Sequence, residues 1–483
     1  MRQAWRVTDV RAAEKALMAT LPEGTLMQRA AAGLARRCAL LLEDSGGVYG
    51  ARVLLLVGSG DNGGDTLYAG AALASRGAQV RALLLSPERV HLAGLAALRQ
   101  AGGFTTADLP TRADLVMDGI VGIGASGGLR PPAAAIVREL GGLRGRDGRR
   151  PIVVAVDVPS GVTVDTGDVP AEAVTADVTV TFGCLKPAHV IGPAATRCGQ
   201  VELVDIGLAR TLTADPAVRV AEAADIAEWW PRPDATSDKY SRGVVGLATG
   251  SAGYPGAALL SATGALAGPT GMVRYAGSAH REVVRAHPSV VAAPRVAETG
   301  RVQAWVCGSG LGTTDEARTE LRSVLATSLP VLLDADAITL LVGGEHAEDL
   351  RRDAPLVLTP HDGEFTRLAG EAPGADRAGS AARLAAWTNA VVLLKGDRTI
   401  VASPAGEIWA NPTGSPALAT AGSGDVLAGL LGSLLAAGLP PVRAAVAAAY
   451  VHGMAGRRAA LDGPATAPDV AAALRPILAA LLS

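Results

Sequence analysis

The chain has 483 residues, a length that allows roughly two or three domains with substantial cores. Lys and Arg number 44 against 46 Asp and Glu, so the formal net charge of −2 provides no basic field for nucleic acid or an anionic membrane. Apolar residues make up 49% and aromatic residues 3%, which predicts Ala, Val and Leu cores in a globular protein rather than base-stacking surfaces. A small molecule is the expected partner.

The N-terminal segment and the cysteines indicate the compartment. Charged residues occur throughout positions 1–15, which argues against a secretory signal. The longest uncharged run, 243–273, holds eight glycines and two prolines, so it predicts a strand, a turn and a buried helix rather than a membrane span. The cysteines form no C-x-x-C motif and are expected to be small buried side chains in a cytoplasmic protein.

Helices and apolar strands alternate in the first half of the chain. Helices are expected at 11–19 and 26–42, and strands at 52–57, 79–85, 115–117, 152–156, 178–182 and 201–204. Continuous apolar runs that end in glycines are typical of buried parallel strands. The alternation therefore predicts a doubly wound α/β sheet.

A polar, proline-containing stretch separates this half from a second glycine-rich region. It predicts domains at 1–208 and 234–483, joined by a linker at 209–233. In the second half, strands are expected at 244–249, 303–306, 331–333, 356–358 and 391–394, followed by long Ala/Leu helices. The second half is thus predicted to be another α/β domain.

The first glycine-rich loop, GSGDNGGD at 58–65, follows an expected strand and opens an expected helix. Gly58, Gly60 and Gly63 match G-x-G-x-x-G, which lets backbone amides and a helix N-terminus approach a pyrophosphate. The next strand ends without the acidic residue that holds a ribose in ordinary dinucleotide folds. A plain dehydrogenase is therefore disfavoured.

Three further polar residues, Asp118, Asp157 and Ser160, follow strands of the same half. Each alone could simply cap a helix. The carboxyl ends of parallel strands meet at one edge of a sheet, where open α/β sheets bind their ligands. Together with the glycine loop, these turns predict a binding site.

In the second half, the segment 411–425 (NPTGSPALATAGSGD) leads into an apolar helix. Glycines before a helix N-terminus form an anion hole, and Asp425 could be a base toward a hydroxyl that attacks a phosphate, or only a helix stabiliser. Lys395, one of four lysines in the chain, ends an apolar strand and suits a phosphate. His361 and Glu364 could serve the site or cap a helix. The absence of G-x-x-x-x-G-K-[ST] excludes nucleotide binding of the P-loop type.

Together these motifs resemble the bifunctional NAD(P)H-hydrate repair enzymes. The first half is similar to the epimerase domain at LMQRA (26–30), GSGDNGGD, 118–128 and VDVPSGV (156–162). The second half resembles the ADP- or ATP-dependent dehydratase at GSAGYPGA (250–257), CGSGLG (307–312), TPHDGEF (359–365), KGDRT (395–399) and 411–425. The resemblance implies a Rossmann-like three-layer first domain and a ribokinase-like α/β second domain.

The resemblance also implies roles for residues. Hydrate binding in the first domain would fall to Asp61, Asn62, Gly63, Gly64, Asp65, Gly122, Ile123, Gly124, Ala125, Ser126, Gly127, Gly128 and Asp157. Potassium would be held by Asn62, Asp118 and Ser160, and Asp157 is expected to move the proton. In the second domain the hydrate would contact Ala257, Gly310, His361 and Asp425, and the adenine nucleotide would contact Lys395, Gly396, Asp397, Arg398, Thr399 and Gly424. Asp61 stands where the family usually has Asn.

The implied activity is repair of hydrated NADH and NADPH. The first domain would interconvert the R and S hydrates, and the second would dehydrate the S hydrate with magnesium and ADP or ATP, giving AMP and phosphate from ADP. Asp425 would take the proton of the C6 hydroxyl. A homo-oligomer is expected. The alternatives are a ribokinase-like kinase of a vitamin-type alcohol fused to a nucleotide-binding domain, and a non-catalytic scaffold role for the first half.

Overall fold

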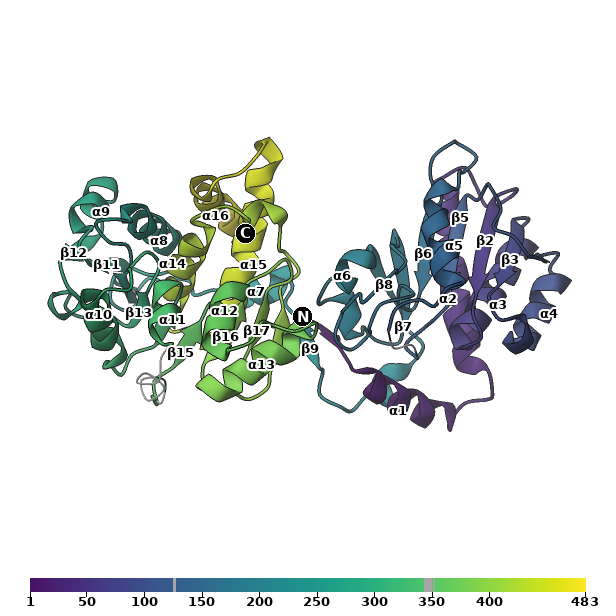
Figure 1. Cartoon of the computed structure of the whole chain (residues 1–483), viewed down its shortest axis with the longest axis horizontal. Helices are drawn as coiled ribbons and strands as arrows, with labels where there is room; N and C mark the ends of the chain where they lie inside the picture. The colour runs from purple at the N-terminus through teal and green to yellow at the C-terminus, as the bar shows by residue number, and fades with distance from the viewer. Residues whose placement is uncertain (125–126, 343–349, 351) are drawn as a thin grey trace. The chain divides into compact units, whose positions relative to one another are not determined.

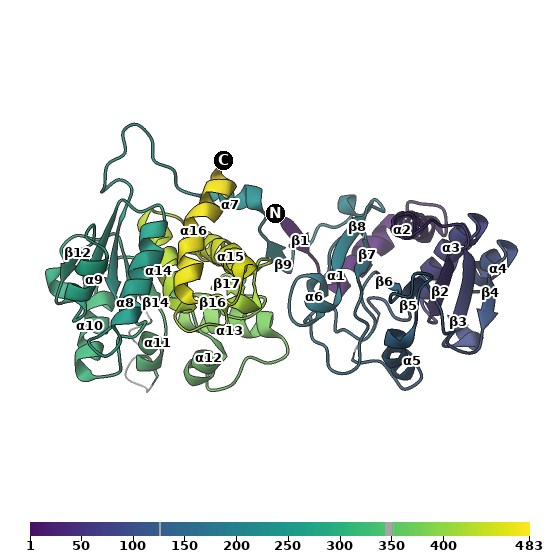
Figure 2. The same ribbon diagram turned by 90° about the horizontal axis from the view of Figure 1, so that it is seen from above.

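The computed structural model describes residues 1–124, 127–342, 350 and 352–483. The chain divides into two compact units, a first domain of Gln3–Val218 and a second domain of Arg219–Ser483 that also includes Met1–Arg2. Each is built on its own β-sheet with helices packed against it (Figures 1 and 2).

The first domain holds a sheet of seven strands in the order β4-β3-β2-β5-β6-β7-β8, and every neighbouring pair is parallel. The strands are β2 (Arg52–Val57), β3 (Gln79–Leu84), β4 (Phe104–Thr106), β5 (Leu115–Gly119), β6 (Ile152–Val156), β7 (Val178–Phe182) and β8 (Gln200–Val204). The chain leaves β2 toward β3 on one side, whereas β5 pairs with β2 on the other side. The loops after β2 and β5 therefore diverge at a topological switch point, where such sheets bind ligands.

Both faces of this sheet are buried beneath helices. These are α1 (Val7–Met18), α2 (Thr25–Glu43), α3 (Asp61–Ser75), α4 (Leu92–Gln100), α5 (Ala133–Glu139) and α6 (Ala194–Arg197). Along β2, Val53, Leu55 and Val57 pack in one apolar core with residues of α1 to α4. Leu54 and Leu56 pack in a second core with residues of α5. The alternation of the side chains confirms the expected three-layer α/β fold.

The second domain holds a sheet of eleven strands in the order β1-β9-β18-β17-β16-β15-β14-β13-β10-β11-β12. Its strands are β1 (Arg2–Ala4), β9 (Val218–Val220), β10 (Val244–Ala248), β11 (Met272–Ala276), β12 (Val291–Ala293), β13 (Ala304–Cys307), β14 (Val331–Leu333), β15 (Leu356–Leu358), β16 (Val391–Leu394), β17 (Ile400–Ala402) and β18 (Ile408–Ala410). The pairs β16–β17 and β17–β18 are antiparallel. The strands from β12 to β16 pair in parallel.

The helices of the second domain enclose an Ala- and Leu-rich core. They are α7 (Ala223–Trp229), α8 (Pro255–Ala267), α9 (His280–Ala286), α10 (Asp315–Leu325), α11 (Asp336–Leu340), α12 (Asp362–Ala369), α13 (Arg377–Thr388), α14 (Ser423–Ala436), α15 (Pro441–Ala459) and α16 (Ala467–Leu482). The uncharged run 243–273 forms β10, the partly buried α8 and the start of β11, and so contains the expected strand, turn and helix. In the described part of the chain, only the bent pair α15–α16, and no single helix, has the length and apolar composition to cross a bilayer.

The stretch expected as a linker, 209–233, contributes regular structure to the second domain. Its residues 218–220 form β9, which pairs with β18. Its residues 223–229 form α7, whose Ile226 and Trp229 lie in the core of the second domain. Trp229 is edge-on to Trp409, with 5.5 Å between the ring centroids. β9 and α7 were not predicted, because both elements are short and the residues around their apolar side chains are polar.

Candidate functional site

In the first domain, the strand-end residues meet at the switch point between β2 and β5. The loop after β2 lies directly against the loop after β5, because a Cβ on Gly58 would clash with the Ile120 carbonyl oxygen. Only glycine permits that approach. The expected phosphate loop and the segment after Asp118 are therefore neighbours.

Asn62, Asp118 and Ser160 bring three side-chain oxygens to this point. Ser160 donates to Asp118 twice, from its hydroxyl at 2.6 Å and from its backbone amide at 2.8 Å. The side-chain Nδ2 of Asn62 donates to the Val156 carbonyl at 2.6 Å. Its carbonyl oxygen faces Gly122, where a Cβ would lie 2.5 Å away. Asp118 at the end of β5 and Ser160 in the turn after β6 are thus in direct contact, and Asn62 of α3 is bonded to the end of β6.

The Asp118 carboxylate is wholly buried. Burial raises the pKa of Asp118 to about 6, against the opposing effect of the Ser160 hydrogen bonds. Among the described residues, no Lys or Arg side chain pairs with it, and no group of three His, Cys, Asp or Glu side chains is placed to hold a metal. One carboxylate beside neutral oxygens suits a cation of low charge, since buried charges require a counter-charge.

Asp157 follows β6 and is held by groups from β7 and the turn after it. Lys186 Nζ lies 2.6 Å from Asp157 Oδ1, and the Thr181 hydroxyl donates to the same oxygen at 2.8 Å. His189 contacts the Asp157 carbonyl oxygen through Nε2 at 2.8 Å. Although burial opposes it, the Lys186 ammonium holds the pKa of Asp157 below its usual range. The backbone of Asp157 is left-handed, with φ +66°, which is rare outside glycine and frequent at functional sites.

A cavity of about 510 Å³ opens between α1 and the start of α3. Its acidic lining comprises Glu14, Glu23, Asp61 and Asp65, and His91 and Phe182 also face it. Asp65 is only 6% exposed, and its Oδ1 has no hydrogen-bond partner among the described residues. Burial, and then the charges of Asp157, Asp61 and Glu14, raise the pKa of Asp65 well above its usual value.

A second cavity of about 420 Å³ is lined by the glycine loop after β2 and by the segment after β5. Its lining includes Gly58, Ser59, Gly124, Gly127 and Gly128, with Arg89 and Arg130 on the same cavity. Ile123 is half-buried against the apolar cores. Two other predicted hydrate-binding residues, Ala125 and Ser126, lie outside the described residues. Gly58 and Ser59 of the glycine loop thus share this cavity with Gly124, Gly127 and Gly128, whereas Asp61 and Asp65 line the 510 Å³ cavity.

In the second domain, Asp425 lies in the first turn of α14. The helix begins directly after Gly422, whose φ of +89° makes the tight turn into it. A Cβ on Gly424 would lie 3.6 Å from Lys395 Nζ, so the ammonium faces the glycine turn. Burial and then the charge of Asp334 raise the pKa of Asp425 to about 7, while the Ser309 hydroxyl opposes the rise. A carboxylate with that pKa is suited to accept a proton near neutral pH.

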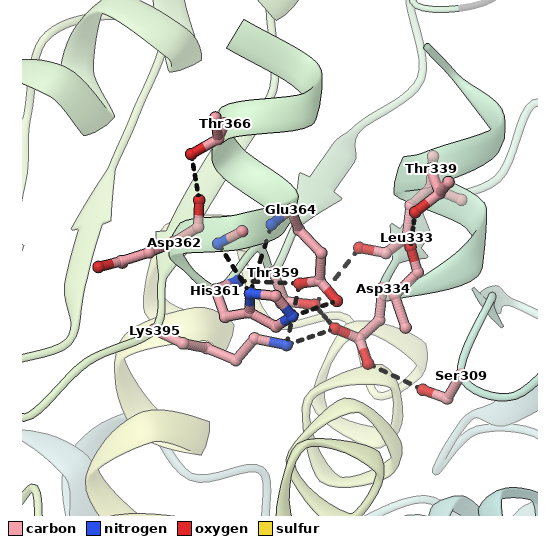
Figure 3. Close-up of polar contacts among 12 residues, drawn as sticks. Ser309, Leu333, Asp334, Thr339, Thr359, His361, Asp362, Glu364, Thr366 and Lys395 are labelled. Atoms are coloured by element: carbon pink, nitrogen blue, oxygen red, sulfur yellow. Dashed lines mark hydrogen bonds and ion pairs between the residues drawn. The ribbon is translucent and has the colours of Figure 1, made fainter. Parts of the chain in front are cut away.

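Lys395 is held by two carboxylates (Figure 3). Its Nζ lies 2.8 Å from Asp334 Oδ1 and 3.5 Å from Glu364 Oε2. Asp334, which directly follows β14, also accepts hydrogen bonds from Ser309 at 2.9 Å and Thr359 at 2.8 Å. These carboxylates raise the pKa of Lys395 although burial lowers it, so the lysine stays charged beside the glycine turn.

His361 and Glu364 form a reciprocal cap on α12. His361 Nδ1 accepts from the Gly363 amide at 2.9 Å, and the His361 amide donates to Glu364 Oε2 at 2.8 Å. The structure therefore confirms the capping interpretation for both residues. Glu364 additionally contacts Lys395, whereas the His361 side chain remains more than half exposed at the same edge.

The remaining predicted residues of this domain form two contacts. Gly310 packs on Ala257, because a Cβ at Gly310 would lie 2.6 Å from the Ala257 methyl carbon. The loop 395–399 joins β16 to β17 and lies against the segment before α14, where Arg398 Nη1 donates to the Pro412 carbonyl at 3.3 Å. In this loop Asp397 is exposed, and Arg398 and Thr399 are partly buried.

Sequence reading missed Asp334 and Lys186 as partners of the predicted residues. Asp334 ends the run VLLD in the same way that Asp118 ends LVMD. The position of an acidic residue at the end of an apolar strand could therefore have predicted it. Lys186 is one of the four lysines and follows β7 closely. Glu14 had no comparable signal, because on the sequence it is one charged residue of a surface helix.

Comparison with known proteins identifies the family. Residues 23–188 match a family profile described as YjeF-related protein N-terminus, and residues 245–475 match one described as NAD(P)H-hydrate dehydratase. The chain is 47% identical over 490 residues to a bifunctional NAD(P)H-hydrate repair enzyme of Mycobacterium leprae, and the match covers 100% of each chain. The chain belongs to the bifunctional NAD(P)H-hydrate repair enzymes.

Other comparisons agree with this family. A repair enzyme of Mycobacterium tuberculosis is 49% identical over 92% of this chain and 91% of its own. An ADP/ATP-dependent NAD(P)H-hydrate dehydratase from Bacillus subtilis, co-crystallised with ATP and Mg²⁺, is 29% identical with a TM-score of 0.50, covering 55% of this chain and 99% of its own. The chain is thus an enzyme with a hydrate epimerase domain and a nucleotide-dependent hydrate dehydratase domain. Family membership confirms the repair activity over the vitamin-kinase and scaffold alternatives.

Proposed function

We propose that the residues assembled at the two sites divide the repair chemistry between the domains. The second domain would use ADP in preference to ATP and release AMP and phosphate, with magnesium present. The first domain would interconvert the R and S hydrates so that both reach the dehydratase. The observation that carries the dehydratase role is the position of Asp425 in the first turn of α14, where Gly424 faces the Lys395 ammonium. Burial raises the pKa of Asp425 to about 7, which suits a base.

In the dehydratase site, Asp425 takes the proton of the C6 hydroxyl as that oxygen attacks the terminal phosphoryl group of the nucleotide. AMP leaves, and phosphate is then expelled from C6 as the ring nitrogen donates its electron pair, with loss of the C5 proton completing the return to NAD(P)H. Lys395 and the amides at the start of α14 meet the negative charge of the transferring group. Ala257, Gly310 and His361 contact the hydrate, and 395–399 with Gly424 hold the nucleotide.

Magnesium would supply further charge neutralisation on the phosphates. Asp334 and Glu364 are both engaged by Lys395, so the nucleotide phosphates and water would provide most of its ligands, as is usual for this ion. The carboxylates of this chain would instead keep Lys395 extended toward the phosphates.

In the epimerase site, the two glycine segments, 61–65 and 122–128, bind the hydrate, and Asp157 accepts a proton during the reaction. Potassium fits among Asn62, Asp118 and Ser160, because Asp118 is a buried carboxylate with neutral oxygens around it. When bound, that ion would neutralise Asp118 and hold the 119–122 loop against α3. We further propose that the protein acts as a cytoplasmic homo-oligomer.

The test is a complete repair assay with an equilibrated mixture of hydrate epimers. With ADP and magnesium, reduced-nicotinamide absorbance should return for both epimers, with AMP and phosphate formed in equal amounts. Replacing potassium by lithium should slow recovery of the R fraction alone. Recovery that stops at the S fraction would contradict the epimerase proposal, and a stable phosphorylated product would contradict the dehydratase proposal.

A further inference from the structure

Asp65 is placed unlike the other carboxylates of the first domain. It lies in the first turns of α3, it is only 6% exposed, and its Oδ1 has no hydrogen-bond partner among the described residues. It lines the 510 Å³ cavity at the start of the phosphate-loop helix. A buried carboxyl group with no donor is costly. Such a group is retained where a ligand or a reaction uses it.

The neighbouring Asp157 is not available for the same task. Its Oδ1 is engaged by Lys186 at 2.6 Å and by Thr181 at 2.8 Å. The ammonium keeps this carboxylate ionised, since it lowers the pKa of Asp157. An ionised, paired carboxylate can accept a proton from an acidic intermediate, but it has no proton to donate.

Epimerisation at C6 requires both kinds of proton transfer. The C6–O bond breaks only if the departing hydroxyl gains a proton and leaves as water, and the ring nitrogen then forms a C6=N⁺ iminium. Water adds to the opposite face of C6 and must lose a proton. We propose that Asp65 is the general acid that protonates the departing C6 hydroxyl, a role that rests on the epimerase function proposed above.

The atoms balance in this scheme. Asp65 loses one proton to the hydroxyl, the iminium gains one water, and Asp157 takes the proton that the added water releases. The two carboxyl groups then return to their starting states by exchange with solvent.

The charges around the cavity favour this chemistry. Asp61 on the same helix, Glu14 on α1 and His91 line this cavity together with Asp65. The charge of Asp157, from the turn after β6, also acts on Asp65. Burial and then the charges of these three carboxylates raise the pKa of Asp65 well above its usual value, which favours the protonated form that a general acid needs. The same carboxylates stabilise the cationic iminium relative to the neutral hydrate, which is the electrostatic requirement of catalysis.

The experiment compares Asp65→Asn with the unchanged full-length protein. Epimerisation of the pure R hydrate should fall by about 10²-fold or more in kcat, with a small change in KM, as expected for loss of a positioned acid. Dehydration of the pure S hydrate with nucleotide should be unchanged, because that site lies in the second domain. Asp108→Asn, an exposed carboxylate of the first domain, is the matched control and should keep both activities.

Two further measurements separate catalysis from structure. Asp65→Asn should not lower the melting temperature of the first domain, since it removes an unpaired buried carboxyl group. Asp65→Glu should restore part of the epimerase activity, with a shifted upper pH limit, because activity requires the protonated acid and falls as pH rises through its pKa. Epimerase activity of Asp65→Asn within threefold of the unchanged protein would overturn the proposal, as would a loss accompanied by a lower melting temperature and no rescue by Glu. Absence of epimerase activity in the unchanged protein would instead refute the proposed function.

Discussion

Lys186 Nζ and Asp157 Oδ1 lie 2.6 Å apart inside the first domain, with 1% and 7% of their side chains exposed. The lysine also donates to the Thr181 hydroxyl at 2.9 Å and the Phe182 carbonyl at 3.0 Å. The three acceptors, Asp157, Thr181 and Phe182, therefore satisfy all three protons of the Lys186 ammonium. They connect the turn after β6 to β7. Its geometry positions the carboxylate that we propose as the proton acceptor.

Lys186→Met should destabilise the first domain by about 3–5 kcal/mol near pH 7, because it leaves the Asp157 carboxylate buried without its counter-charge. The double variant Lys186→Met/Asp157→Asn should recover much of this loss. Since the pKa of Asp157 is lowered, the carboxylate contributes stability above its unfolded pKa of about 4, and that stability is lost as pH falls through the folded pKa. Urea unfolding should thus show a difference between Lys186→Met and the unchanged protein that shrinks in acid. A difference below about 1 kcal/mol at pH 7 would contradict a tight pair.

Asp425→Asn should abolish nucleotide-dependent dehydration while epimerisation continues. The expected loss is about 10²- to 10⁴-fold, since a positioned general base is removed. The measurement follows absorbance recovery from pure S hydrate with ADP, and interconversion of the epimers serves as the internal control. Unchanged dehydration would exclude Asp425 as the base.

Dehydration should depend on pH through Asp425, whose pKa of about 7 reflects burial and then Asp334. The base must be ionised, so kcat should rise with pH below 7 and level off above it. Asp334→Asn should move the midpoint lower, because it removes a like charge. Ser309→Ala should move it higher, because the Ser309 hydroxyl lowers the pKa of Asp425. Identical midpoints in all three proteins would assign the titration to another group.

A break in the chain between Thr211 and Val218 should yield two soluble pieces, each with its own activity. The break precedes β9 and α7, which belong to the core of the second domain. A break after Ala221 should leave the C-terminal piece less stable, since it separates β9 from β18. Thermal melting and both assays on the two pairs of fragments test this. Equal stability of the two C-terminal pieces would show that β9 contributes little.

Asp61→Asn should bind the hydrate more tightly and lower KM, whereas kcat should not rise, because the Asp61 charge also raises the pKa of Asp65. Asp61 is exposed at the start of α3 and lines the acidic cavity, so its carboxylate repels the substrate phosphates expected at this loop. Solvent screening limits the gain to about fivefold, and added salt should reduce it further. The assay compares KM and kcat of epimerisation at low and high ionic strength. Slower epimerisation with weaker potassium dependence would instead place Asp61 at the cation site.

The apolar pattern was sufficient to predict the buried parallel strands. β2, β6, β7, β14, β15 and β16 have the expected bounds, because strands covered on both faces are continuous apolar runs. The short strands β4, β11, β12, β17 and β18 were not predicted. Three-residue strands such as β17 and β18 owe their pairing to neighbouring strands, and β11 includes an arginine, Arg274, that breaks the apolar run.

The α/β class, the order of the two domains, the glycine loops and the strand-end carboxylates could be predicted from the residues alone, because they follow from local composition and spacing. Pairing among those groups depends on the folded chain instead. Asp157 meets Lys186 across 29 positions and Lys395 meets Asp334 across 61, while Asp65 Oδ1 has no hydrogen-bond partner in the described part of the chain. Long-range packing sets these distances and the burial around each carboxyl group, and they in turn decide whether it holds or releases a proton.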